Sequence, residues 1–429
     1  MVLCIVSQNY IFFPRKIFNT ELILHPMLIT GLAIFLITYA LISIRRRKGS
    51  RITRPTAALF GASLMIIFGV VSVEQALSSI DLNIIFLLIG MMAMVSIFQF
   101  SGFFEWIISR IVLISRTSGR LFLFVSISTA FLSALFVNDA VVLFFTPIIL
   151  SITKENGLDP VPFLISEIFS ANIGSVATEI GNPQNAYIAI KSSIPFFHYL
   201  LLMLPVSIVS LAISLLIIYY FYRGEMKREL KTDIEKKMIR NNKLFYSASI
   251  TMILILFSFF FSRNIAIIPF IGASILLFLS PFISEVDPRR IIKDIDWGII
   301  LFFVGLFIVL EGVILSGILS SMMYAFDSLG LQITSPLWYV TFVAIVSNLV
   351  SNVPAVLLIS PITGGKFWLL LAMSSTLAGN ATIIGAVANI IVLEIASLWG
   401  VEISWTTFSK VGLPVTILTI ISGTLILLI

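Results

Sequence analysis

The stretch Ser133–Pro147, which reads SALFVNDAVVLFFTP, is an apolar run that one polar pair, Asn138-Asp139, interrupts. A related stretch, Ser347–Pro361, reads SNLVSNVPAVLLISP and has its polar pair at Ser351-Asn352. In both stretches an asparagine of the pair stands nine residues before a proline. The same order at two distant places indicates that the chain contains two related halves.

Each of these stretches is followed by a second interrupted apolar run. The first reads TEIGNPQN over Thr178–Asn185, and the second reads TIIGAVAN over Thr382–Asn389. Glycine and proline inside such runs allow a helix to unwind locally. We predict that the four interruptions meet near the middle of a membrane and form one ion and substrate site.

The composition places the chain among membrane proteins. Hydrophobic residues make up 59% of the 429 residues and charged residues only 11%, whereas a soluble domain has roughly 25% charged residues. Many of the apolar runs are long enough to cross ~30 Å of bilayer hydrocarbon as helices. The sequence therefore predicts an all-α polytopic membrane protein.

Charge, cysteine and histidine content exclude several classes of function. The net charge of +6 is a signal of membrane topology, and no nucleic-acid partner is expected. Cys4 is the only cysteine, which excludes an internal disulfide and a multi-thiolate metal site. His25 and His198 are far apart, neither lies at an interruption, and no Gly-x-Ser-x-Gly motif stands out. We predict that the protein is not an enzyme and has no cofactor beyond a coupling ion.

Matching segments extend the repeat over nearly the whole chain. Asp81–Gly90 (DLNIIFLLIG) matches Asp296–Gly305 (DWGIILFFVG), 215 residues later. Asn138 and Pro147 recur after 214 residues, and Gly181 and Asn185 after 204. We predict repeat 1 over 27–222, a basic cytoplasmic linker over 223–243 and repeat 2 over 244–429. Residues 1–26 are expected to be an interfacial or disordered segment.

Each repeat is predicted to hold five membrane-spanning segments and one hairpin. The hairpins are expected at 121–152 and 336–362, and the interrupted helices at 161–190 and 367–398. An odd number of crossings makes the second repeat enter the membrane in the opposite orientation. This topology places 22 lysines and arginines on the cytoplasmic side and five outside, which is the bias expected of membrane proteins.

The hairpins are predicted to be re-entrant. The second limb of the second hairpin, Val353–Ile362, has ten residues and spans only ~15 Å as a helix. Non-helical backbone at that depth is tolerated where it is buried in protein or lines a cavity. The alternative, two short crossing helices joined by an ordinary loop, would spoil the charge bias.

The chemistry of the interruptions predicts an ion site. Local unwinding is expected to free backbone carbonyls for a cation and to leave half-helix N-termini that favour an anion. Acidic residues inside spans are costly and usually functional. Asp139 and Glu179 lie at the first pair of interruptions, and their counterparts are Val353 and Ile383. The first pair can therefore hold Na+ or a proton, whereas the second offers neutral dipoles only.

Three further acids, Glu167, Glu311 and Glu394, also fall within spans, and Glu167 is a candidate for a cytoplasmic access path. A structural hydrogen-bonding role is the alternative for all three. The candidate Na+ ligands are Asn138, Asp139 and Asn185. The full set of candidate substrate and ion ligands is Asn138, Asp139, Thr178, Glu179, Gly181, Asn182, Asn185, Ser351, Asn352, Asn380, Thr382 and Asn389.

These motifs resemble the ion transporter superfamily, which includes arsenite permeases, NhaD-type antiporters and divalent-anion/sodium symporters. The matching stretches are FVNDAVVLFFTP, ANIGSVATEIGNPQN, SNVPAVLLISP and GNATIIGAVAN. Dicarboxylate members carry Ser-Asn-Thr at the tips, whereas this chain has Val137-Asn138-Asp139 and Ser351-Asn352-Val353. The Asn-Asp tip looks more like the arsenite permease and uncharacterised anion-permease branch. The resemblance implies inverted repeats, an elevator-type motion, often a homodimer and, for the arsenite type, a soluble ATPase partner.

The sequence leaves two transport hypotheses. The first is a secondary carrier in the plasma membrane for a small anion or oxyanion, including arsenite, coupled to H+ or Na+ through Asp139 and Glu179. The second is a Na+/H+ antiporter of the same fold. A passive channel is less consistent with paired inverted hairpins, which favour alternating access.

Overall fold

The computed structural model describes residues 26–43, 52–230, 238–262, 265–318 and 335–429. The expected N-terminal segment, the Arg45–Arg51 part of the first loop and residues 231–237 of the linker lie outside these ranges. The described chain is helical, and its only extended pairing is one isolated bridge between Thr117 and Glu229. The predicted all-helical, polytopic class is confirmed.

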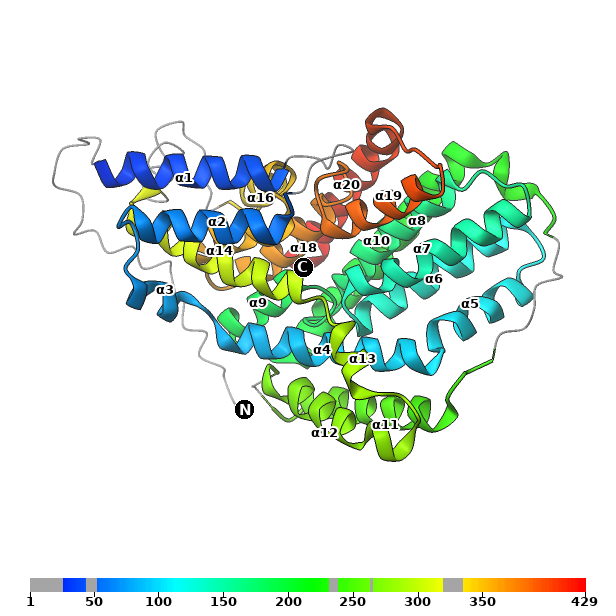
Figure 1. The fold of residues 1–429 in the computed structure, drawn as a ribbon. Coiled ribbons are helices and arrows are strands. Elements are labelled where there is room, and N and C mark those ends of the chain that lie inside the picture. Colours follow the sequence, from blue (N-terminus) through cyan, green and yellow to red (C-terminus); the bar gives the residue numbers. More distant parts are fainter. Residues whose placement is uncertain (1–25, 44–51, 231–237, 263–264, 319–334) are drawn as a thin grey trace, which may run out of the picture.

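The first half of the chain forms ten helices within the described residues (Figure 1). They are α1 (Pro26–Ser43), α2 (Arg54–Ile67), α3 (Val73–Ser79), α4 (Leu82–Ser101), α5 (Phe103–Ile114), α6 (Ser118–Leu135), α7 (Asn138–Glu155), α8 (Val161–Ser175), α9 (Pro183–Ser192) and α10 (Phe196–Tyr222).

The second half follows a short 3-10 turn at Glu225–Lys227 and has the same order of long helices, hairpin and interrupted helix. Its described helices are α11 (Asn242–Phe259), α12 (Ile267–Ile283), α13 (Pro288–Lys293), α14 (Trp297–Leu315), α16 (Pro336–Val350), α17 (Asn352–Ile359), α18 (Phe367–Ala378), α19 (Val387–Leu398) and α20 (Trp405–Leu428).

Six described helices are long and apolar enough to cross a membrane, namely α4, α6, α10, α11, α14 and α20. Helix α2 ends at Ile67, well short of the next helix. Gly69 adopts a left-handed φ of 71°, and Ser72 then starts α3 with a capping box to Gln75. A glycine in this conformation is a common end of a helix.

Helix packing between the two halves is reciprocal. Helix α2 of the first half packs on α14 of the second, and α12 of the second packs on α4 of the first. The hairpin limb α7 contacts α19, and its counterpart α17 contacts α9. Helices α10 and α20 pack on each other. Such exchanged contacts are expected of two halves related by an approximate two-fold axis.

Two matched glycines allow the closest of these helix crossings. A Cβ on Gly90 of α4 would lie 2.3 Å from the backbone nitrogen of Phe270 in α12. A Cβ on Gly305 of α14 would lie 2.6 Å from the carbonyl carbon of Ala58 in α2. Small residues at such crossings allow helix backbones to approach in a membrane. The two repeats therefore share these glycine-mediated helix contacts as well as the sequence motifs.

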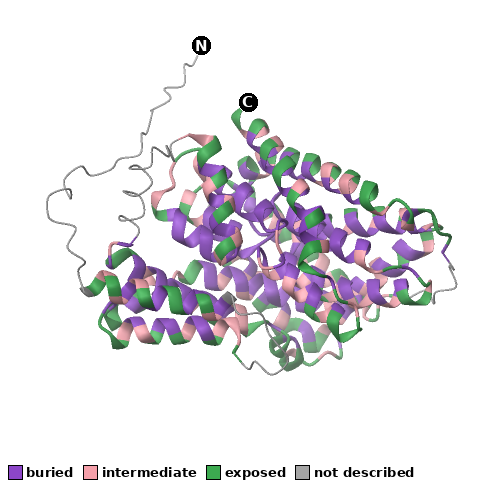
Figure 2. Cartoon of the chain, turned by 90° about the horizontal axis from the view of Figure 1, so that it is seen from above, coloured by how far each residue is buried: buried purple, intermediate pink, exposed green. Residues whose placement is uncertain are grey.

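Burial divides the molecule into an interior and an apolar outer surface (Figure 2). The most apolar 18-residue window of α4 is 78% buried, whereas that of α11 is 28% buried. Large apolar side chains such as Phe257, Phe278 and Phe282 are exposed on α11 and α12. An exposed apolar surface of this kind fits contact with lipid. The turns of the hairpins and the interruptions of the helices lie in the interior, where Asn138, Asn182, Asn352 and Asn380 are buried.

We predict that Gly90→Ala and Gly305→Ala each destabilise the fold by ~1–3 kcal/mol, because the added methyl group overpacks a backbone contact. Thermal unfolding of the purified protein in detergent measures the effect as a lower Tm. Gly364→Ala is the matched control, since a Cβ there meets nothing within 4 Å. Equal Tm values for all three variants would contradict the prediction.

Candidate functional site

The turn of the first hairpin lies two residues before the predicted Asn138-Asp139, and the turn of the second lies at Ser351, within the predicted Ser351-Asn352 pair. The first turn is Phe136-Val137, and Asn138-Asp139 forms the start of α7. The second turn is Ser351, at a φ of 75°, and Asn352 starts α17. The polar residues sit here because the first turn of a helix has unpaired amide groups and a partial positive charge, which suit amide and carboxylate side chains.

Each hairpin is bonded to the interruption of its own repeat. The backbone N–H of Asn138 donates to the carbonyl of Gly181 at 2.9 Å. The Thr178 hydroxyl donates to the carbonyl of Ala134 at 2.5 Å. In the second repeat the Thr382 hydroxyl donates to Oδ1 of Asn348 at 2.8 Å. Asn348 is the counterpart of Ala134. The matched threonine therefore bonds to the hairpin in both repeats, to a backbone carbonyl in the first and to a side-chain amide in the second.

Two matched asparagines satisfy the carbonyls that each interruption exposes. Nδ2 of Asn185 donates to the carbonyls of Ser175 and Thr178 at 2.9 and 3.3 Å. Nδ2 of Asn389 donates to the carbonyls of Gly379 and Thr382 at 2.6 and 2.9 Å.

Four of the carbonyls at the interruptions thus already accept a hydrogen bond from an amide side chain, and cation binding by the freed carbonyls stays a prediction. Unpaired carbonyls in a buried interruption would cost free energy, and the amide side chains remove that cost. The proposed Na+ ligation by Asn185 stays a prediction. Its amide nitrogen is used to hold the interruption together.

Asn172 joins the two repeats at the end of α8. Its Nδ2 donates to Oδ1 of Asn380 at 2.9 Å and to Oδ1 of Asn389 at 3.0 Å. Its Oδ1 accepts from Nδ2 of Asn138 at 3.2 Å. One buried amide thus connects the first hairpin, the first interrupted helix and the second interruption.

Thr376, the counterpart of Asn172, makes the reciprocal connection. Its hydroxyl lies 3.4 Å from Nδ2 of Asn182, 3.3 Å from Nε2 of Gln184 and 3.5 Å from Oδ1 of Asn185. Asn182 also caps α9, because its Oδ1 accepts the backbone N–H of Asn185 at 2.8 Å. The two interruptions therefore lie next to each other. The first is bonded to α18, and the second is bonded to α8.

The two acids at the interruptions, Asp139 and Glu179, are unequally satisfied. The carboxylate of Asp139 accepts a hydrogen bond from the backbone N–H of Ala388, in the first turn of α19. Both carboxyl oxygens of Glu179, which is fully buried, lack a hydrogen-bond partner among the described residues. An ionised carboxylate without a partner is very costly in such a place. Glu179 therefore requires a proton or a bound cation.

Unsatisfied oxygens mark where Na+ could bind. Besides those of Glu179, Oδ1 of Asn138 is a buried acceptor without a partner in the described chain. Carboxylate and amide oxygens suit a hard cation. Within the described residues no group of three or more His, Cys, Asp or Glu side chains could hold a metal ion, so a Na+ site here would depend on amide, hydroxyl and carbonyl oxygens.

The structure brings most of the predicted site residues into one connected network. Asn138, Thr178, Gly181, Asn182, Asn185, Asn380, Thr382 and Asn389 take part directly. Ser351 and Asn352 bond locally, since Oδ1 of Asn352 accepts from the backbone N–H of Val353 at 2.9 Å.

The sequence reasoning missed Asn172, Gln184, Asn348 and Thr376. Their signal was a polar side chain within or beside an interrupted apolar run. Asn172 and Gln184 stood in the quoted segments without a role.

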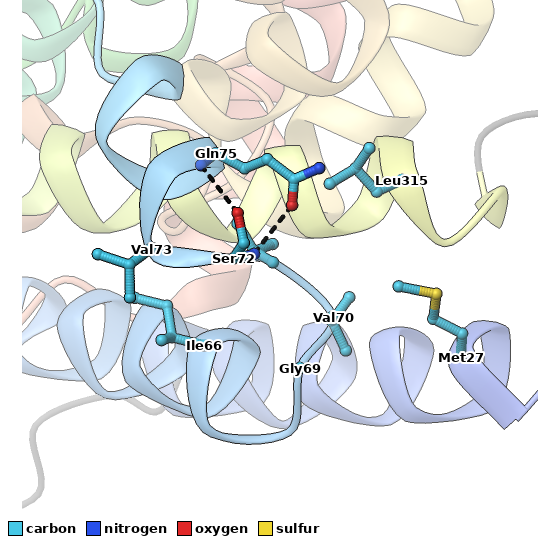
Figure 3. Close-up of a pocket in the computed structure, with 9 residues that line it drawn as sticks. Met27, Ile66, Gly69, Val70, Ser72, Val73, Gln75 and Leu315 are labelled. Carbon is cyan, nitrogen blue, oxygen red and sulfur yellow. Dashed lines mark hydrogen bonds between the residues drawn. The ribbon is translucent and has the colours of Figure 1, made fainter.

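One surface pocket, formed by described residues, lies away from this network (Figure 3). Its volume is about 410 Å³, and it is lined where α1, α2, α3 and α14 meet. Met27, Ile66, Val70 and Leu315 face it, beside the capping bonds between Ser72 and Gln75. None of the predicted site residues lines this pocket.

Helical hairpins, interrupted helices and a buried polar junction define a multi-pass membrane transporter. The family model described as "Citrate transporter" (CitMHS) matches residues 39–366. The chain therefore belongs to the citrate transporter family. A similar fold occurs in the YdaH transporter of Alcanivorax borkumensis, with a TM-score of 0.56, 12% identity and coverage of 94% of this chain and 96% of that one.

Relatives with diverse names align over most of their length. A "46 kDa membrane protein" of Mycobacterium leprae is 27% identical over 92% of this chain and 96% of its own. The silicon efflux transporter LSI3 of Oryza sativa subsp. japonica is 29% identical over 80% and 85%. The putative transporter arsB of Dictyostelium discoideum is 24% identical over 87% and 86%. These likenesses agree with the resemblance inferred from the motifs.

We predict that Asn172→Leu destabilises the protein by several kcal/mol, because three buried amides lose a partner at ~1–3 kcal/mol each. The measurement is the Tm of the purified protein in detergent. Asn83→Leu, at an exposed position on α4, is the control and should leave Tm nearly unchanged. If the two variants had the same Tm, the amide junction would not hold the repeats together.

Proposed function

We propose that this chain is a secondary active transporter of a small oxyanion or its protonated acid, coupled to H+ or Na+. The observation that supports this most is the crossing of two interrupted helices beside buried acids. Discontinuous helices from two repeats form the substrate and ion sites of many secondary transporters. Asp139 lies at such a half-helix N-terminus, against the N–H of Ala388.

The charge of the interior favours a weak oxyacid as substrate. Asp139, Glu167 and Glu179 are buried, and no lysine or arginine is among the buried residues of the described chain. A permanently charged anion would therefore need compensating cations. A weak acid such as arsenite or silicate can enter in its protonated form and bond to amides and hydroxyls. The names of two relatives, arsB and the silicon efflux transporter, fit this substrate class.

We assign the coupling ion to Asp139 and Glu179. Glu179 is buried without a hydrogen-bond or cationic partner among the described residues, so it must be neutralised before it can be moved through the hydrocarbon. Asp139 interacts electrostatically with the half-buried Arg54, so its charge is only partly compensated. Both H+ and Na+ would neutralise these carboxylates. Arsenite would be bound by oxygen and nitrogen ligands, because Cys4 is the only cysteine.

We propose that this transporter is located in the plasma membrane. A homodimer is the proposed assembly, and a soluble ATPase is a partner to be tested only if arsenite proves to be the substrate.

Asp139→Asn is expected to reduce gradient-driven uptake to background, because the amide cannot gain or lose a proton. Reconstituted vesicles with an imposed pH or Na+ gradient and a panel of arsenite, silicate, sulfate and citrate measure this. Glu285→Gln, at an exposed position, should transport like the unmodified protein. Unchanged uptake by Asp139→Asn would remove the coupling role from this residue.

The alternative function is a Na+/H+ antiporter, which the unpaired carboxyl group of Glu179 favours. A pH-sensitive dye inside the same vesicles separates the two functions. An antiporter changes the internal pH when Na+ is added without any oxyanion, and Glu179→Gln should abolish the change. An oxyacid carrier gives no response until arsenite or silicate is present.

A further inference from the structure

Glu167 is a fully buried acid that the coupling scheme above does not use. It lies on α8 and has no exposed surface. It precedes Asn172 by five residues, or ~7.5 Å along the helix axis. Helix α8 begins at Val161, six residues before Glu167. The positive charge bias of the sequence predicts that this end of the helix faces the cytoplasm. Glu167 therefore stands between the cytoplasmic side and the crossing of the interruptions.

The hydrogen bonds of Thr146 are compatible with a protonated carboxyl group at Glu167. The Thr146 hydroxyl lies 2.6 Å from the carbonyl of Val142 and 2.9 Å from Oε1 of Glu167. A hydroxyl has one proton to donate, and a carbonyl can only accept. With that proton given to Val142, the contact to Glu167 is a hydrogen bond only if the carboxyl group donates. The geometry thus fits a protonated Glu167.

A second arrangement is available to the same atoms. If Glu167 loses its proton, the Thr146 hydroxyl can turn and donate to Oε1, and the carbonyl of Val142 keeps its helical surroundings. Threonine hydroxyl groups switch partners by rotation alone. Thr146 can therefore stabilise Glu167 in either protonation state. Oε2 has no hydrogen-bond partner among the described residues and remains open to a further donor or acceptor.

Buried hydroxyl groups also line the contact between α6 and α8, the helix that carries Glu167. Ser126 and Ser166 are 2.5 Å apart across this contact. Ser170 on α8 and Thr129 and Ser133 on α6 are buried, and their hydroxyl oxygens have no partner within the described residues. Unsatisfied buried hydroxyls call for an explanation such as a role in proton movement or unseen water. Their positions run from the level of Ser126 toward Asn138.

We propose that Glu167 is a proton-binding relay site between the cytoplasm and the interior junction. This rests on the proposed function, in its proton-coupled form. The carboxyl group of Glu167 gives its proton to an ionised carboxylate at the interruptions, that of Asp139 or Glu179, and the Thr146 hydroxyl then donates to the carboxylate of Glu167. A proton from the cytoplasmic side restores the neutral acid and returns Thr146 to Val142.

Other titratable groups on the elements packed against α8 do not pair with Glu167. No salt bridge to Glu167 occurs among the described residues. Buried groups on these elements are Asp139 on α7 and Tyr199 on α10. The remaining ones are half-buried or exposed: Arg120 on α6, Lys154 and Glu155 on α7, His198, Tyr219, Tyr220 and Tyr222 on α10, Glu394 on α19 and Lys410 on α20.

Infrared spectroscopy of the purified full-length protein tests the protonation state without any substrate. At neutral pH the unmodified protein should show the carbonyl stretch of a protonated carboxyl group. Glu167→Gln should remove one such component, and Thr146→Val should shift it. The exposed Glu402→Gln should leave the component in place. A spectrum in which Glu167→Gln removes nothing would overturn the proposal, even if the protein transported no tested substrate.

Transport then separates a relay from a structural acid. Glutamine copies the shape of a protonated glutamate and can still donate to Thr146, so a purely structural role predicts normal transport by Glu167→Gln. A relay predicts at least a tenfold loss of pH-driven arsenite or silicate transport in vesicles, with partial rescue by Glu167→Asp. It also predicts a changed pH profile for Glu167→Asp. A wild-type rate and pH profile in Glu167→Gln would refute the relay.

Discussion

The structure depends on hydrogen bonds that each repeat supplies to the interruption of the other. A helix that breaks inside an apolar environment exposes backbone groups that no water can satisfy. Here Asn185 and Asn389 bond those carbonyls within each repeat, while Asn172 and Thr376 bond across. Neither interruption is complete without the other half of the chain. The polar junction is therefore a condition of the fold as well as the place where ions can bind.

The shared framework carries unequal chemistry. The acids Asp139, Glu167 and Glu179 all belong to the first repeat. At the same offsets, the second repeat has Val353, Leu371 and Ile383, which are apolar and buried. Backbone and amide interactions are thus duplicated, and titratable groups are not. One repeat can supply the coupling group while the other supplies a neutral surface, an arrangement that a strictly symmetric pair could not provide.

The sequence predicted the architecture better than the local bonding. The four interruptions, the helical class and the position of most site residues followed from polar residues in apolar runs. The partners of Asn172 could not be predicted, because Asn380 and Asn389 lie more than 200 residues away. The hydrogen bonds from Asn185 and Asn389 to the carbonyls of the interruptions could not be predicted for a related reason. Whether an asparagine binds an ion or a carbonyl depends on side-chain direction, which periodicity does not encode.

The distribution of charge explains why transport by this fold should be coupled to a cation. Buried acids without buried bases make an interior that is negative when ionised, and an ionised group is costly at the centre of a bilayer. Any motion that carries the first hairpin through hydrocarbon is therefore favoured only when its acids are neutral. In the transporter proposed above, a proton or Na+ would supply that neutrality at one face, and its release at the other face would return the charge. The proposed coupling would then follow from solvation energy, with no need for a direct contact between ion and substrate.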